Sequence, residues 1–185
     1  MPDPIPTDLD PDRVGYMAFT AANPYTIAMR LHAAGVAEIP GPRVNPLIAA
    51  MNHGAGAGNN EDAPWCASFV HFCHWILCYQ CPPGPAGARA WLNAGDQLTL
   101  LKARRGDVVI FWRDSPDGWK GHVGFLHKWS STGDPIIIGG NQDDKVSLLT
   151  MPRSRVLGVR RPKPHLTLVA AIDTLPEPTT GGSEV

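Results

Sequence analysis

The pattern of apolar and polar positions along this chain changes period near its middle. Between residues 24 and 79 apolar residues recur every three or four positions, the spacing of an amphipathic helix. From residue 106 onward, short β-branched and aromatic runs are separated by turn-forming residues, which is typical of strands. Helices first and strands afterwards predict an α+β domain in which helices cover a small antiparallel sheet.

The first two helices are predicted from their end signals. One spans residues 24–35, with Pro24 in its first turn and Gly35 closing it. A weaker signal predicts about two turns from Pro46, followed by a loop over "GAGAGNN" at 54–60.

The third helix follows from "APWCASFVHFCHW". Pro64 suits the first helical position and Ala63 the N-cap, which makes Cys66 the third helical residue. The helix is expected to run to about Tyr79 and to end before Pro82.

The second half contains one more helical piece and then the strands. "GARAWLNAG" predicts a short helix. Four strands are predicted from "GDVVIFW", "GHVGFLHKW", "PIIIGGN" and "VLGVRRP".

The length of 185 residues suits one compact domain. Residues 13–165 are expected to form it. The Pro-rich residues 1–12 are expected to be a flexible lead, and residues 166–185 a tail that is largely flexible at its end.

Charge and hydropathy limit the classes of partner that we expect for this chain. A formal net charge of −1 provides no basic field for a phosphate backbone, so nucleic acid is not an expected partner. No apolar run approaches the roughly 20 residues that span a bilayer. The N-terminus lacks the pattern of a signal peptide, so we expect synthesis in the cytoplasm.

Cys66 is the candidate nucleophile. Backbone N–H groups and the partial positive charge at a helix N-terminus favour a thiolate over a thiol. Cys66 also lies at the end of the apolar stripe that includes Phe69, Val70 and Cys73, so its sulfur is expected to point toward the sheet.

His122 is the candidate base. It opens the predicted strand "HVGFLHKW" at the mouth of the sheet. His127 lies five residues further along, and this odd offset places it on the opposite face. Only one of the two histidines can then meet Cys66.

The strand register predicts a third residue. With a hairpin loop at 130–133, His122 faces Asn141, whose amide could hold one nitrogen of the imidazole. A slip of one residue would give this role to Gln142, or to Asp143 at the strand end.

Cysteine, histidine and an orienting amide form the arrangement that acyl transfer through a thioester requires. The thiolate attacks, the imidazolium protonates the leaving amine, and water hydrolyses the thioester. The Cys66 backbone N–H and a second donor, Asn59 or Asn60, are expected to receive the oxyanion.

These motifs resemble the CHAP family of cysteine- and histidine-dependent amidohydrolases and peptidases, within the papain-like NlpC/CHAP group. The matching stretches, within residues 24–162, are "AAGVAEIPGPRVNPLI", "PWCASFVHFC", "RRGDVVIFW", "GWKGHVGFL", "IIIGGNQ" and "VLGVRRP". The resemblance implies a papain-like fold and hydrolysis of amide bonds in peptidoglycan stem peptides without a metal or other cofactor. The third catalytic residue varies in that group, and Cys78 and Cys81 match no motif of it.

The remaining cysteines allow two interpretations. Cys73 is expected in the core. His71, His74, Cys78 and Cys81 could suggest zinc, but four ligands within eleven residues of largely one helix can hardly close a tetrahedron, so no metal is predicted. A strained Cys78–Cys81 disulfide is the other option.

Two other functions stay open: a non-catalytic wall-binding module, and a thiol amidase for a small amide outside the wall. For the enzyme, we expect a monomer that reaches the cell wall or periplasm either as a phage lysin released by a holin or as an injected antibacterial effector. An effector would have an immunity protein as its partner.

Overall fold

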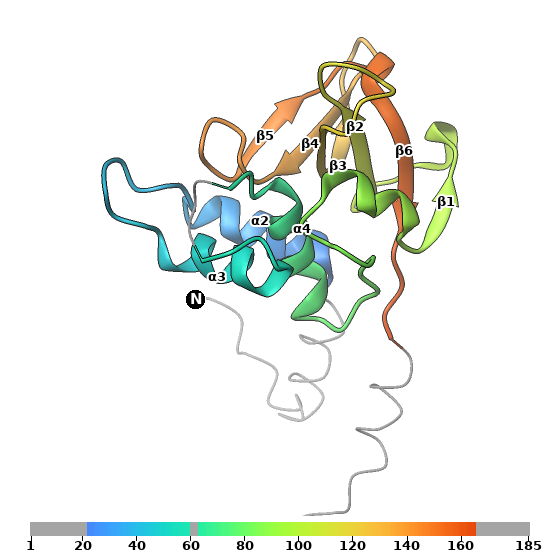
Figure 1. Ribbon diagram of the computed structural model, residues 1–185. Coiled ribbons are helices and arrows are strands. Elements are labelled where there is room, and N and C mark those ends of the chain that lie inside the picture. Colours follow the sequence, from blue (N-terminus) through green and yellow to red (C-terminus); the bar gives the residue numbers. More distant parts are fainter. Residues whose placement is uncertain (1–21, 60–62, 166–185) are drawn as a thin grey trace, which may run out of the picture.

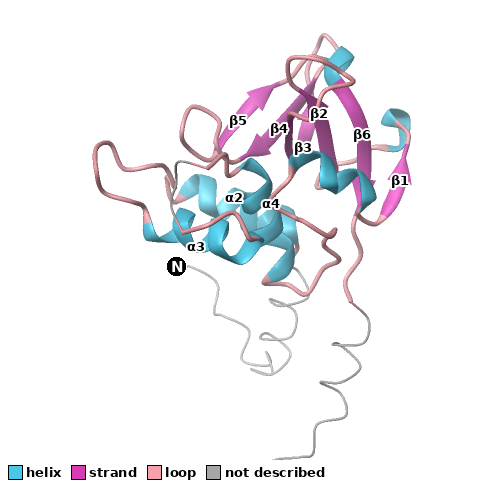
Figure 2. Ribbon diagram, viewed as in Figure 1, coloured by secondary structure: helices cyan, strands magenta, loops and turns pink. Residues whose placement is uncertain are grey.

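The computed structural model describes residues 22–59 and 63–165, and the fold is the predicted α+β arrangement (Figure 1). A group of helices lies beside one antiparallel sheet, with the helices contributed by the first half of the chain (Figure 2). The helical elements are α2 (Pro24–Ala33), α3 (Pro46–Ala55), α4 (Cys66–Trp75) and the 3₁₀ turns η1 (Ala88–Asn93), η2 (Leu100–Lys102) and η3 (Arg153–Arg155).

The sheet has six strands in the order β1-β6-β2-β3-β4-β5, and every neighbouring pair is antiparallel. The strands are β1 (Asp96–Leu98), β2 (Val108–Trp112), β3 (Gly121–Trp129), β4 (Pro135–Gly139), β5 (Ser147–Thr150) and β6 (Val156–Arg161). The four predicted strands are confirmed as β2, β3, β4 and β6. The edge strands β1 and β5 were missed, because both are short and mostly exposed and so lack an apolar alternation.

Helix α2 begins at Pro24 as predicted and ends at Ala33, two residues before the predicted end. The Asn23 side chain accepts a hydrogen bond from the Thr26 N–H, and the Thr26 side chain pairs in return with the Asn23 backbone. This reciprocal capping satisfies two N–H groups that the first turn leaves without a helical acceptor. Gly35 follows the helix with φ 69°, a left-handed conformation that favours glycine.

Helix α3 is longer than the two turns predicted. Asn45 caps it by accepting from the Leu47 N–H at 3.0 Å, and the helix continues through Gly54 to Ala55. Gly56, with φ 80°, ends it. The predicted loop therefore starts two residues later than the glycines suggested, because a single helical glycine is tolerated where the neighbours pack well.

Helix α4 begins two residues later than predicted. Neither Ala63 nor Pro64 is part of it; Trp65 is the N-cap, and Cys66 is the first helical residue. Trp65 has φ −105° and ψ 15°, outside the helical range, and its indole Nε1 donates to Glu38 Oε1 at 2.6 Å. A tertiary contact thus holds Trp65 out of the helix, and Cys66 lies in its first position.

The other end of α4 was also predicted wrongly. The helix stops at Trp75 and not near Tyr79. Cys78 adopts φ 54°, and its N–H donates to the Trp75 carbonyl while the Tyr79 N–H returns to the His74 carbonyl at 2.9 Å. This left-handed residue ends the helix before the prolines are reached.

The core has two layers, one on each face of the sheet. The larger layer lies between the helices and the sheet and includes Trp65, Cys66, Phe69, Val70, Cys73, Val123, Phe125 and Ile138. The smaller one includes Val109, Phe111, Leu126, Ile137, Met151 and Val159. Cys66 therefore belongs to the layer that joins α4 to β3, as its stripe predicted.

Gly140, just after β4, allows the start of α4 to approach the sheet. A Cβ atom at this position would overlap the Trp65 ring and would lie 2.7 Å from the Phe69 Cβ. The missing side chain therefore sets how closely the first turn of α4, with Cys66, packs on the strand ends.

The predicted lead at 1–12 and the predicted tail at 166–185 lie outside the described residues. Within residues 22–59 and 63–165, none of the helices has the length and apolar character needed to cross a membrane.

We expect Gly140→Ala to lower the free energy of unfolding by about 1–3 kcal/mol, because the new methyl group overpacks the contact with Trp65. Gly54→Ala is the matched control: a Cβ there meets nothing within 4 Å, and alanine favours a helix by up to about 1 kcal/mol over glycine. Urea unfolding of both variants measures this. Equal stability of the two would contradict the close approach of α4 to the sheet.

Candidate active site

The Cys66 sulfur lies at the first position of α4, where it meets the start of β3. Only 5% of the residue is exposed. The backbone N–H groups of Val123, Ala67 and Cys66 itself lower the pKa of this thiol. Such N–H groups at a helix start have no acceptor within the helix. The surroundings of the thiol therefore provide several fixed donors.

The pKa of the Cys66 thiol is nevertheless raised, which reverses the direction expected from the helix N-terminus. Burial is the largest cause, and it outweighs the charge of Arg113 and the backbone N–H groups of Val123, Ala67 and Cys66, all of which lower the pKa. Desolvation penalises the charged form of a thiol. The expectation of a resting thiolate is therefore wrong: in this conformation the sulfur carries its proton.

His122 lies near the start of β3, opposite Phe111 of β2, and only 1% of it is exposed. Both ring nitrogens have partners. Nε2 lies 3.0 Å from Gln142 Oε1, and Nδ1 lies 3.1 Å from an Nη2 of Arg113.

These partners determine which nitrogen of His122 carries the proton. The Gln142 side-chain Nε2 donates to the Ser147 carbonyl at 2.6 Å and lies 3.1 Å from Ser147 Oγ, so Oε1 must be the atom that faces His122. An oxygen acceptor requires a proton on His122 Nε2. Arg113 can only donate, so Nδ1 keeps its lone pair. This lone pair, which accepts from Arg113, is the one a general base needs.

The third residue predicted from the register, Asn141, is not the one that contacts His122. Asn141 lies past the end of β4 in a left-handed conformation with φ 52°, where the chain turns. The turn brings Gln142 to the imidazole instead, as the one-residue slip allowed. Asp143 is exposed, with φ 55°.

Gly139, the last residue of β4, makes room for this pair. A Cβ there would lie 2.6 Å from Gln142 Oε1 and 3.3 Å from His122 Nε2. Each glycine of the "GGNQ" sequence is therefore required by a different close contact. Gly139 leaves room for the His122–Gln142 pair, and Gly140 leaves room for the start of α4.

The register that guided this prediction is right near the site and wrong at the hairpin. Phe125 pairs with Ile138 as expected, whereas Trp129 pairs with Pro135, one residue beyond the predicted partner. A bulge between Leu126 and Lys128 absorbs the difference. A bulge is not visible in an apolar alternation, so only the structure reveals it.

His127, the other strand histidine, lies at this bulge. Its Nδ1 is 2.6 Å from the Tyr25 hydroxyl of α2, and the two rings stack. The His127 side chain therefore helps to hold α2 against the sheet.

Arg113 acts on both candidate catalytic groups and was not predicted from the sequence. Its guanidinium bonds His122 Nδ1, and its charge lowers the pKa of Cys66. Within the described residues, no hydrogen bond joins Cys66 Sγ to the imidazole. The structure thus brings Cys66 and His122 to one end of the sheet, with Arg113 on the nitrogen that would take the thiol proton.

The pKa of His122 is lowered to about 4, chiefly by burial and further by the charge of Arg113, while the hydrogen bond that His122 donates to Gln142 acts to raise it. The resting site is therefore a neutral imidazole beside a protonated thiol.

Of the two side chains predicted as the second oxyanion donor, one is bonded elsewhere and the other is not among the described residues. The side chain of Asn59 pairs with His53 Nδ1 at 2.7 Å, and Asn60 lies outside the described residues. The backbone N–H of Cys66, the other predicted donor, lies at the start of α4, where helical N–H groups have no acceptor within the helix.

The other cysteines have no part in this arrangement. Cys73 is fully buried in the core, as predicted, and Cys78 and Cys81 are free thiols.

His74 Nδ1 bonds the Val70 carbonyl at 2.8 Å, and its ring stacks on Phe125. Among the residues that the structure describes, no group of three His, Cys, Asp or Glu side chains could hold a metal ion.

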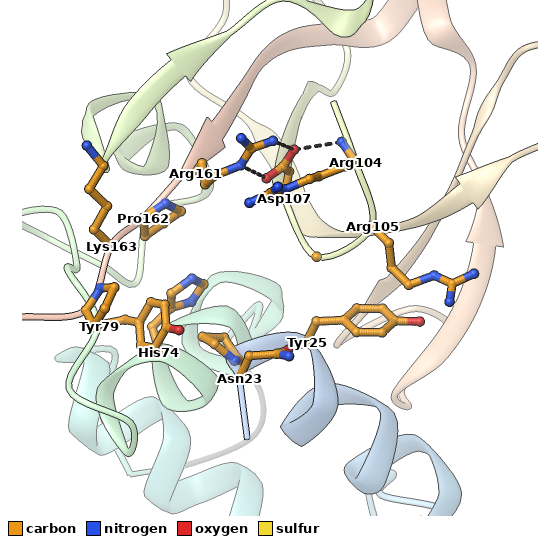
Figure 3. Close-up of a pocket in the computed structure, with 13 residues that line it drawn as sticks. Asn23, Tyr25, His74, Tyr79, Arg104, Arg105, Asp107, Arg161, Pro162 and Lys163 are labelled. Atoms are coloured by element: carbon orange, nitrogen blue, oxygen red, sulfur yellow. Dashed lines mark hydrogen bonds and ion pairs between the residues drawn. The ribbon is translucent and has the colours of Figure 1, made fainter. Parts of the chain in front are cut away.

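A cavity of about 600 Å³ lies at the opposite end of α4, near His74 and Tyr79 (Figure 3). Asp107 binds Arg161 there with two hydrogen bonds of 2.7 and 2.8 Å and also accepts from the Arg104 N–H. The cavity is not lined by Cys66 or His122. Its ion pair joins Asp107, the residue before β2, to Arg161 of β6 and is structural.

Comparison with known proteins finds no relative by sequence and a distant similarity by structure. No protein-family profile and no curated protein sequence matches the chain. Among solved structures it is similar to the P60 domain of the M. avium paratuberculosis antigen MAP1272c, with a TM-score of 0.43 and 14% identity over 80% of this chain and 98% of that chain. A similarity at this level supports no functional conclusion.

We expect the buried histidines to make stability depend on pH. His122 and His74 each have a folded pKa of about 4, below the unfolded value near 6.5. Between these values the unfolded chain binds more protons, so stability falls as pH falls from 6.5 to 4, by roughly 3 kcal/mol for each histidine. Urea unfolding across this range should show His74→Phe with a shallower loss than wild type, and the exposed His53→Gln with the wild-type loss. Identical profiles for all three proteins would refute the lowered pKa of His74.

We expect Gln142→Ala to cost about 1–3 kcal/mol of unfolding free energy, because it leaves the buried His122 Nε2–H without an acceptor. Asn141→Gly, which keeps the left-handed backbone, should change stability by less than about 0.5 kcal/mol. Chemical denaturation at pH 7.5 compares them. A larger loss in the Asn141 variant would restore Asn141 as the supporting residue.

Proposed function

We propose that this protein is a cysteine-dependent hydrolase that cleaves amide bonds in the stem peptides of peptidoglycan. The observation that carries the proposal is a buried thiol at a helix start, near the end of the sheet where Gln142 holds a buried histidine in one tautomer. These are the parts of an activated nucleophile and its oriented base.

The first half of the reaction forms the thioester. His122 Nδ1 takes the Cys66 thiol proton, and the sulfur attacks the carbonyl carbon of the amide. The negative charge passes to the carbonyl oxygen, which backbone N–H groups at the start of α4 can receive. The imidazolium then gives its proton to the amide nitrogen, the carbon–nitrogen bond breaks, and the amine leaves.

Water completes the cycle. His122 takes a proton from the water molecule that attacks the thioester carbon, and returns it to the sulfur as the carbon–sulfur bond breaks. Gln142 keeps the Nε2 proton in place throughout, because its own orientation is set by Ser147. The acid product leaves, and the thiol is restored.

The substrate class depends on the motif resemblance to the CHAP family described above. A cell-wall substrate implies delivery across a membrane, by a holin if the protein is a phage lysin or by injection if it is an antibacterial effector. An immunity protein that blocks the surroundings of Cys66 would accompany the second case.

A non-catalytic wall-binding module is the second candidate. Burial raises the pKa of Cys66, and in the described residues its sulfur has no hydrogen bond to His122, as would hold if turnover had been lost. A thiol amidase acting on a small amide outside the wall would use the same site, and no feature of the described residues favours it.

Purified sacculi test the proposal. We expect the wild-type protein to release soluble muropeptides, and Cys66→Ala to lower the rate of release by at least about 10³-fold, because the nucleophile is removed. Mass spectrometry of the products identifies the bond that is cut. Cys81→Ala is the matched control, a half-buried thiol outside the site that should retain wild-type release.

The same sacculi separate the alternatives. Release of nothing by wild type, combined with pull-down of the protein by sacculi, would establish the binding module. Equal release by wild type and Cys66→Ala would place the chemistry elsewhere.

A further inference from the structure

We propose that Arg113 is a substrate-recognition residue, which binds a carboxylate beside the scissile amide and in doing so leaves His122 Nδ1 free for the Cys66 thiol. The proposal rests on the hydrolase function above and adds the chemical class of its substrate: an amide flanked by an acidic group.

The guanidinium of Arg113 has an incomplete set of partners. Arg113 is exposed, and in the described part of the chain the neutral His122 Nδ1 is the one group that its side chain hydrogen-bonds. The neighbouring carboxylate, Asp114, forms its ion pair with Lys120 at 2.9 Å instead. Within the described residues, the other side-chain N–H donors of Arg113 have no protein acceptor.

The loop that holds Arg113 has a fixed backbone. The Arg113 N–H donates to the Lys120 carbonyl at 3.2 Å, across the loop. From η1, the Arg89 guanidinium donates to the carbonyls of Lys120, Pro116 and Ser115, each at 2.9 Å. The base of the Arg113 side chain is thus held in place, while its charged end is accessible.

A carboxylate is the ligand that this group fits best. The planar fork of arginine matches a carboxylate with two parallel hydrogen bonds, and charge-assisted bonds are about twice as strong as neutral ones. Compared with such a ligand, a neutral imidazole nitrogen is a weak acceptor. A carboxylate within reach of Arg113 should therefore draw its donors away from His122.

This exchange would complete the catalytic pair. His122 Nδ1 holds the only lone pair on the ring that can take the thiol proton, and Arg113 covers it at 3.1 Å. Because the guanidinium lies on the base itself, the carboxylate it binds must belong to a residue that flanks the cleaved bond. Substrates without this group would leave the base covered.

Matched peptides test the proposal. One is a peptidoglycan stem peptide with a free α-carboxylate on its γ-linked glutamyl residue; the second has this group amidated, and the third has only the C-terminal carboxylate amidated. We expect wild type to cleave the first with a kcat/KM about tenfold or more above one of the amidated forms. The form that loses activity identifies which carboxylate is bound.

Variants assign the preference to Arg113. Arg113→Gln should cleave all three peptides with similar kcat/KM, and Arg113→Lys should keep part of the preference, because lysine retains the charge but not the fork. Lys120→Gln removes a charge from the same loop and should keep the full preference. Circular dichroism and the urea midpoint check that each variant is folded.

The outcomes separate this proposal from the function on which it rests. Equal cleavage of the three peptides by wild type, or a preference that persists in Arg113→Gln, would overturn the role of Arg113 and leave the hydrolase intact. Cleavage of none of them by wild type would remove both.

Discussion

The candidate site depends on one buried chain of hydrogen bonds that runs from Ser147 through Gln142 to His122. The Ser147 carbonyl orients the Gln142 amide, and the amide oxygen fixes the proton on His122 Nε2. This chain crosses from β5 to β3, so the sheet order itself places the base. With the proton held on one nitrogen, the other faces Arg113 as an acceptor, and every chemical proposal above uses that lone pair.

Around this chain, two opposing electrostatic effects determine the resting state. Backbone N–H groups at the start of α4 and the charge of Arg113 favour a thiolate at Cys66, but burial favours the thiol, and burial is the larger effect. The same burial keeps His122 neutral. In this closed site the Cys66 thiol has not yet given its proton to His122. On the proposal for Arg113, an anionic ligand that binds Arg113 would allow this proton transfer.

Close approach of the backbone makes this geometry attainable. Gly139 leaves space for the His122–Gln142 pair, and Gly140 lets Trp65 and the first turn of α4 rest on the strand ends. Glu38 Oε1 also accepts a hydrogen bond from the indole Nε1 of this tryptophan, at 2.6 Å. The nucleophile and the base are therefore positioned by neighbouring glycines, each through an absent side chain.

The sequence by itself determined the order of elements, the four main strands, the placement of Cys66 on the core-facing side of a helix start, and His122 at the opening of β3. Periodicity and proline or glycine signals carry this information because they act between near neighbours in the chain. Only the tertiary structure decided that Trp65 is excluded from α4, because its partner Glu38 lies 27 residues away.

The choice of Gln142 over Asn141 and the contact of Arg113 with His122 were also decided by tertiary structure. A left-handed turn after β4 decides which side chain meets the imidazole, and such a turn is not visible in the apolar pattern. The protonation of Cys66 could not be predicted from the sequence for the same reason. The helix start is a local feature that the sequence reveals, whereas the burial that outweighs its effect on the pKa is produced by the packed fold.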